Sequence, residues 1–129
     1  MSKENTSRKR TKSIGGRKGE RYMQPSILMT LKQGPTYGYE LIQNISRFAF
    51  IRGNAPPGMV YRHLREMEES GLVVSEWKTD EGGPAKRIYR LTPDGEEVLG
   101  YWIDYMEQLA RKMLAFVEMY REQVSGRRS

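Results

Sequence analysis

The last third of the chain carries a heptad repeat of apolar residues that a single small domain has no surface long enough to bury. Seven such residues follow one another at alternating spacings of three and four: Leu99, Trp102, Met106, Leu109, Met113, Phe116 and Tyr120. This spacing is typical of the a and d positions of a coiled coil. A helix over residues 93–124 would be roughly 45 Å long at about 1.5 Å per residue. We therefore expect a homodimer, with packing against the first helix of the same chain as the alternative for part of the stripe.

Three residues of this stripe would lie near the dimer axis. Trp102, Met106 and Leu109 could line an apolar pocket for a small apolar or aromatic effector. The other reading is that they belong to a core, as most Met and Trp stripes do.

The net charge of +6 is concentrated at the N-terminus. Residues 1–21 hold eight basic and two acidic side chains, which accounts for the whole excess, and Arg8, Lys9 and Arg10 form its densest run. The segment lacks an apolar period, so we expect a disordered basic arm that binds nucleic acid through phosphate attraction. A solubilising tail is the alternative.

Composition excludes several classes of protein. The 129 residues suffice for one domain, and the hydrophobic share of 37% allows only a small core. There is no cysteine and one histidine, His63, so we expect no disulfide, no metal site and no cofactor. No apolar run approaches the length of a membrane span, and the basic N-terminus has no apolar region of a secretory signal after it. These features predict a cytoplasmic protein without a membrane partner.

The pattern predicts a mainly α (α+β) fold made of helix, helix, helix, hairpin and long helix. The short helices are expected at about 25–33, from a Thr36 cap to about 47–50, and at 57–70, closed by Gly71. The strands are expected at 72–77 and 86–91, and Thr92 is expected to cap the final helix, which has Pro93 in its first position. We thus predict a winged helix-turn-helix domain at 22–92, a dimerisation helix at 93–124 and a disordered tail at 125–129.

In a helix-turn-helix, the second helix of the pair enters the DNA major groove and reads bases mainly through its N-terminal residues. Here that helix begins at Pro57, and a helical wheel places Val60, Leu64 and Met67 on its buried side. Arg62 and Arg65 lie opposite, where an arginine can bond a guanine in bidentate fashion. Alternatively, these arginines form surface ion pairs with Glu66, Glu68 or Glu69.

Other residues around this face are weaker candidates. Gly58 permits close backbone approach to DNA, and His63 is expected to contact phosphate or solvent rather than a metal. Tyr37 and Tyr39 could fix a phosphate or equally cap the core. The full set of candidate DNA contacts is Tyr37, Tyr39, Gly58, Met59, Tyr61, Arg62, His63, Arg65, Lys86 and Arg87, with Arg8, Lys9 and Arg10 on the arm.

The stretch DEGGPAKRIYRLT, residues 80–92, is predicted to be the wing. Lys86 and Arg87 on its returning strand are placed to meet the phosphate backbone, whereas Asp80 and Glu81 at the tip would repel it. An enzyme with a phosphate-binding glycine loop is disfavoured, because a strand pattern and not a helix follows Gly82 and Gly83.

Three separated motifs together resemble the PadR family of transcriptional regulators. They are GPTYGYELI at 34–42, GMVYRHLREMEESGLVVSEW at 58–77 and GGPAKRIYRLTPDG at 82–95. Met59 and Val60 depart from the Thr and Leu of many members, and Met67 replaces a usual Leu. The length resembles the members with a single C-terminal helix. The resemblance implies a homodimer that binds double-stranded operator DNA, usually as a repressor, and that often releases it when a small effector binds.

A second class of function remains open on the sequence alone. A winged helix can serve as a module for protein or non-specific nucleic-acid contact without operator reading. The acids Glu66, Glu68 and Glu69 on the recognition helix would suit such a role.

Overall fold

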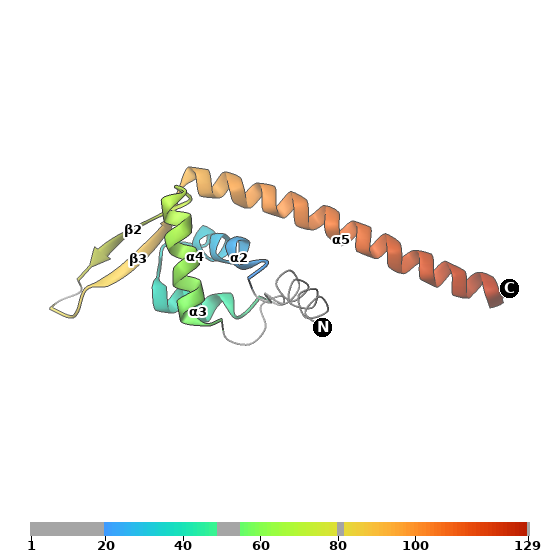
Figure 1. The fold of residues 1–129 in the computed structure, drawn as a ribbon, viewed down its shortest axis with the longest axis horizontal. Helices are drawn as coiled ribbons and strands as arrows, with labels where there is room; N and C mark the ends of the chain where they lie inside the picture. Colours follow the sequence, from blue (N-terminus) through green and yellow to red (C-terminus); the bar gives the residue numbers. More distant parts are fainter. Residues whose placement is uncertain (1–19, 49–54, 80–81, 129) are drawn as a thin grey trace, which may run out of the picture.

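The computed structural model describes residues 20–48, 55–79 and 82–128. A small domain of three helices and a sheet carries two projections that point in opposite directions, the wing and the long helix α5 (Figure 1). In chain order the elements are α2 (Met23–Lys32), β1 (Thr36–Tyr37), α3 (Gly38–Ile45), α4 (Pro57–Glu69), β2 (Val73–Lys78), β3 (Lys86–Leu91) and α5 (Pro93–Arg128). The predicted fold class, a winged helix-turn-helix with a long C-terminal helix, is confirmed.

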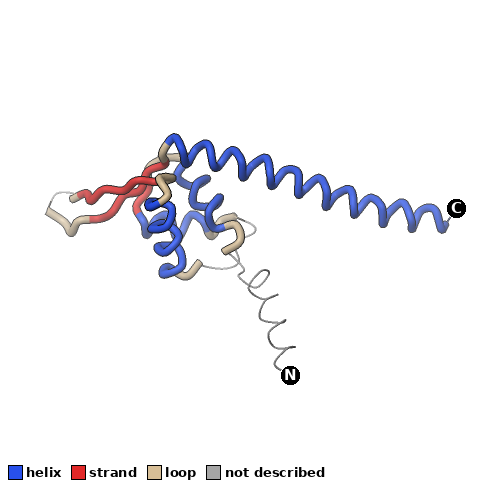
Figure 2. The backbone as a smooth tube through the Cα atoms, turned by 45° about the horizontal axis from the view of Figure 1, so that its top comes forward, coloured by secondary structure: helices blue, strands red, loops and turns tan. Residues whose placement is uncertain are grey.

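The core lies where α2, α3 and α4 meet the start of α5 (Figure 2). The predicted stripe of Val60, Leu64 and Met67 is buried, with at most 2% of each residue exposed. It packs with Ile27 and Leu28 of α2 in one cluster of buried side chains. The apolar period of these short helices therefore predicted their inward faces correctly.

The sheet has three antiparallel strands in the order β1-β3-β2, so the prediction of two strands was incomplete. Thr36 and Tyr37 pair with Tyr89 and Ile88 of β3. The expected cap at Thr36 was wrong, because this residue lies in β1 and its hydroxyl donates to the carbonyl of Gly34 at 2.9 Å. The wing itself is the predicted pair, β2 and β3, and it is hydrogen-bonded from Val73–Leu91 to Lys78–Lys86.

Helix boundaries differ from prediction by more than one residue at three places. Helix α2 begins at Met23, two residues before the expected start, since a proline is tolerated anywhere in the first turn, where backbone N–H groups have no helical partner. Helix α3 ends at Ile45, before the expected end, and residues 49–54 are outside the described part. Helix α5 continues to Arg128, so the tail expected to be disordered from residue 125 is helical to that point. The apolar stripe of α5 ends near Val124, but a helix can continue without apolar residues. Gly126 lowers helix stability by only about 1 kcal/mol and does not end it.

The join between the wing and α5 is as predicted. The hydroxyl of Thr92 accepts a hydrogen bond from the backbone N–H of Gly95 at 3.0 Å and so caps α5. The same hydroxyl lies 2.7 Å from the carbonyl of Gly71, two residues beyond the end of α4. Gly71 has a φ of +81°, the left-handed geometry expected of a glycine that ends a helix. The start of α5 is thereby tied to the end of α4.

Candidate nucleic-acid interface

Helix α4 presents a mixed polar face on the side opposite its core stripe. Gly58, Arg65 and Glu69 are exposed, and Arg62 is half-exposed. Apart from the neighbours of Gly58 and its own helix backbone, nothing in the described part of the chain lies within 4 Å of the place where a side chain on Gly58 would begin, so this end of the helix is open to close approach. The structure thus places Arg62 and Arg65 outward, as the helical wheel predicts.

Arg62 is held by two carboxylates. Its Nη2 donates to Oε1 of Glu20 at 3.0 Å, and its Nη1 lies 3.8 Å from Oε2 of Glu66 on the next turn. The hydrogen bond from Arg62 is the main cause that lowers the pKa of the Glu20 carboxyl, against the opposing effect of its partial burial. The same bond raises the pKa of Arg62. The predicted pairing with Glu66 therefore exists, but Glu20 is the nearer partner.

Glu20 also approaches the single histidine of the chain. His63 Nε2 lies 3.3 Å from the same Glu20 oxygen, and 16% of the histidine side chain is exposed. Within residues 20–48, 55–79 and 82–128, no group of three His, Asp or Glu side chains could hold a metal ion. The sequence showed Glu20 only as one of two acids in a basic segment, and no periodicity pointed to its contact with α4.

A groove of about 430 Å³ joins α4 to the wing. Its lining combines aromatic rings and cations from α3, α4, β2 and β3: Gly38, Tyr39, Tyr61, Trp77, Ala85, Lys86, Arg87 and Tyr89. Tyr37 and Tyr39 stack with ring centroids 6.1 Å apart, and the Lys86 ammonium lies 5.9 and 5.5 Å from the two rings. The predicted contacts Tyr39, Tyr61, Lys86 and Arg87 thus come together on one surface.

Trp77 on β2 belongs to this groove and was missed by the sequence reasoning. It is 64% exposed, and the guanidinium of Arg87 stacks over its ring at 5.3 Å. Arg87 also donates from Nε to the Ser75 hydroxyl at 2.8 Å and lies 3.6 Å from Glu68. The register of the wing could have indicated the pair, because Trp77 and Arg87 are direct cross-strand partners.

The remaining predicted DNA contacts divide into two groups. Met59 is half-buried and packs against the core cluster. Arg8, Lys9 and Arg10 lie outside the described residues. Their predicted role in DNA binding stays a prediction.

The apolar stripe on α5 is buried at its N-terminal end and exposed to solvent at its C-terminal end. Leu99 is 6% exposed, and Trp102 packs against the core and donates from Nε1 to Gln24 at 2.8 Å. By contrast Met113, Phe116 and Tyr120 are 60%, 73% and 69% exposed. The first part of the stripe therefore packs within the chain, and the distal part is left on the surface of this single chain.

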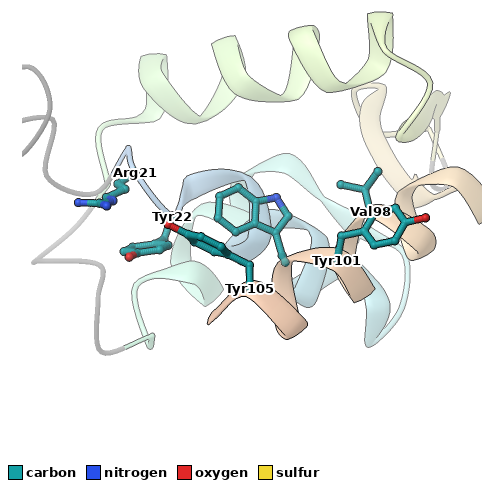
Figure 3. Close-up of a pocket in the computed structure, with 6 residues that line it drawn as sticks. Arg21, Tyr22, Val98, Tyr101 and Tyr105 are labelled. Carbon is teal, nitrogen blue, oxygen red and sulfur yellow. The ribbon is translucent and has the colours of Figure 1, made fainter. Parts of the chain in front are cut away.

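A cavity of about 340 Å³ lies between the start of α2 and α5 (Figure 3). It is lined by Arg21, Tyr22, Val98, Tyr101, Trp102 and Tyr105. The Trp102 ring meets those of Tyr22 and Tyr105 edge to face, with centroids 6.2 and 6.0 Å apart. Of the three predicted pocket residues, Trp102 is in this wall, whereas Met106 and Leu109 are half-buried further along the helix.

Comparison with known proteins agrees with this geometry. The model of the transcriptional regulator PadR-like family matches residues 27–101, more than half of the chain. The chain therefore belongs to the PadR-like family of transcriptional regulators. In particular, it is 35% identical over 88 residues to the transcriptional regulator Rv3488 of Mycobacterium tuberculosis, an alignment that covers 68% of this chain and 78% of the relative.

Solved structures show the same fold. TA0346 from Thermoplasma acidophilum is 34% identical, with a TM-score of 0.61, over 71% of this chain and 85% of that one. PadR of Bacillus subtilis, solved in complex with operator DNA, is 22% identical with a TM-score of 0.57, over 64% of this chain and 47% of its own. In the described part of the chain, no helix is both long and apolar enough to cross a membrane.

Proposed function

We propose that the chain is a sequence-specific, DNA-binding transcriptional regulator of the cytoplasm that acts as a dimeric repressor and not as an enzyme. The observation that carries this proposal is the groove in which Tyr39, Tyr61, Lys86 and Arg87 converge from α3, α4 and the wing. Cations beside aromatic rings suit a sugar–phosphate backbone, and phosphate contacts fix the register of a helix in the major groove. Arg62 and Arg65 then stand on the outward face of α4 to read bases.

The proposed dimerisation is supported by the solvent-exposed distal part of the apolar stripe on α5. Large apolar side chains at Met113, Phe116 and Tyr120 are costly to leave in water, and a second copy of the same helix offers a matching stripe. Two-fold symmetry would present two recognition helices to half-sites about one helical turn, roughly 34 Å, apart. The operator is then a palindrome or nearly so.

The aromatic cavity beside Trp102 is the proposed effector site. Four aromatic rings suit a flat apolar or aromatic compound, and Arg21 in the wall could pair with an acidic group on it. With Phe in place of Trp77, Trp102 is the one tryptophan left and reports on the cavity. Titration with a planar aromatic probe should quench its fluorescence in a saturable way. Fluorescence quenching that does not saturate would mean that the cavity does not bind such a compound, and would contradict the proposed effector site.

The second candidate is a winged-helix module for protein or non-specific nucleic-acid contact. The acids Glu66, Glu68 and Glu69 of α4 supported this candidate, but two of these carboxylates contact other side chains of the same chain. Glu66 lies 3.8 Å from Arg62, and Glu68 accepts from Ser75 at 2.8 Å and lies 3.6 Å from Arg87. These contacts offset part of the negative charge of α4, which weakens the argument for a cationic protein partner and favours the DNA reading.

Selection from random duplex DNA separates the two candidates. A regulator should enrich a two-fold sequence that still shifts in a gel against excess unrelated duplex at physiological salt. Binding without any enriched sequence, lost as salt approaches that level, would instead identify a non-specific module. A promoter fusion carrying the enriched sequence would then report the sign of regulation.

A further inference from the structure

We propose that Glu20 is a positioning residue that holds Arg62 in the orientation needed to read one base pair. This inference rests on the proposed function, since it gives Arg62 a base to read. No motif or family feature described above assigns a role to Glu20. Glu20 is anchored through its backbone at the start of α2, and its carboxylate bonds directly to Arg62.

Glu20 is fixed to the folded domain at its backbone. Its carbonyl accepts a hydrogen bond at 3.2 Å from the backbone N–H of Met23, the first residue of α2, whose side chain is completely buried. The Glu20 side chain is only 22% exposed and reaches α4, where it meets Arg62 and His63. It is thus a local anchor between the start of α2 and the recognition helix.

The contact leaves the outer part of the arginine available. Arg62 keeps 42% of its side chain exposed although it is bonded to Glu20 through Nη2 and approached by Glu66 at Nη1. A guanidinium carries five N–H donors, and these two carboxylates do not use them all. Arg62 can therefore keep its bond to Glu20 and still present donors to a base edge.

The two carboxylates also change which DNA contacts Arg62 favours. A free arginine is flexible and pairs with any phosphate, whereas one held by two carboxylates has lost rotamer freedom before DNA arrives and is largely neutralised. Preorganisation of this kind improves contacts that depend on geometry, such as a bidentate bond to a guanine, more than contacts that depend on charge alone. Glu20 is accordingly expected to add selectivity and to subtract some non-specific affinity.

The test measures base discrimination and not affinity alone. The base pair read by Arg62 is first found as the operator position at which Arg62→Ala loses selectivity. At that position Glu20→Ala and Glu20→Gln should reduce discrimination by about tenfold, the scale of a good bidentate contact. Their affinity for unrelated duplex should stay level or rise. In a protein that already carries Arg62→Ala, the additional substitution Glu20→Ala should cause no further loss of discrimination.

A matched control separates positioning from net charge. Glu107 on α5 is also paired with an arginine, Arg111, at 2.8 Å, so Glu107→Ala removes the same charge and a similar ion pair away from α4. It should leave discrimination intact. If Glu20→Ala leaves discrimination unchanged, or raises affinity equally for all sequences, Glu20 does not position Arg62 and the inference is overturned. A wild-type protein without any preferred sequence would instead refute the proposed function itself.

Discussion

Gly95 lies where the structure leaves no room for a side chain. It lies in the first turn of α5, where a Cβ would collide with the backbone carbonyl oxygen of Leu72 and would stand 2.7 Å from Cδ1 of Leu91. A backbone carbonyl tied into the join between α4 and α5 cannot move aside cheaply. We predict that Gly95→Ala destabilises the protein by about 2–3 kcal/mol, the upper range for overpacking, in a urea unfolding experiment.

Gly100, five residues further along the same helix, is the natural control. Among the described residues, nothing beyond its neighbours and its own helix backbone lies within 4 Å of where its Cβ would be, so Gly100→Ala should stabilise the helix by about 0.5–1 kcal/mol. The two substitutions are chemically identical and should have opposite signs. Equal effects would mean that the close approach at Gly95 does not constrain the fold.

Glu20 gives a prediction for pH at the same scale. Its hydrogen bond to Arg62 lowers its pKa below the usual 4.5, so the ion pair stabilises the folded state above that pH and is lost as the pH falls through the lowered value. Melting temperatures of wild type and Glu20→Gln should therefore differ slightly near neutral pH and converge as the pH falls well below 4.5. A difference that grows on acidification would contradict the assigned contact.

At the scale of elements, Lys86 tests the role of the wing. Lys86 is exposed at the start of β3 and lies beside the stacked rings of Tyr37 and Tyr39. If it neutralises one phosphate, Lys86→Ala should weaken binding about equally for all sequences and flatten the slope of log affinity against log salt by about one. Lys112→Ala on the exposed part of α5 removes the same charge as a control and should leave the slope unchanged.

The elements also show where reasoning from sequence succeeds. Apolar periods of 3.6 and of 2 residues predicted α4, α5 and the wing. Each of these elements is long enough for its apolar pattern to repeat and so to be seen in the sequence. Strand β1 was missed since Thr36 and Tyr37 are only two residues, too few for a period, and their pairing with β3 depends on the tertiary fold. The contact of Glu20 with Arg62 spans 42 positions along the chain and leaves no local pattern at all. The groove residue Trp77 lay in a correctly predicted strand, but its partner Arg87 follows only from the strand register.

At the scale of the molecule, α5 is the feature that one chain leaves incomplete. Its first turns are anchored by Leu99 in the core and by Trp102 against α2, so the helix leaves the domain in a fixed direction (Figure 1). Beyond them the exposed apolar side chains cover a face wider than an a/d stripe, because Leu114, Val117 and Met119 are exposed as well. A face of that width suits contact with more than one element of a partner.

We therefore predict a dimer that depends on the distal half of α5. Wild type should give about twice 15.0 kDa by light scattering at micromolar concentration, and Phe116→Glu should give 15.0 kDa, since it sets a charge in the middle of the apolar face. Ala115→Glu adds the same charge outside the a/d stripe, about 100° around the helix from Phe116, and should remain dimeric. Because two linked half-sites bind far more tightly than one, the Phe116→Glu monomer should also lose at least about a hundredfold in operator affinity while its binding to a single half-site persists. A monomeric wild type, or a Phe116→Glu variant that still dimerises, would mean that the apolar face of α5 serves another partner.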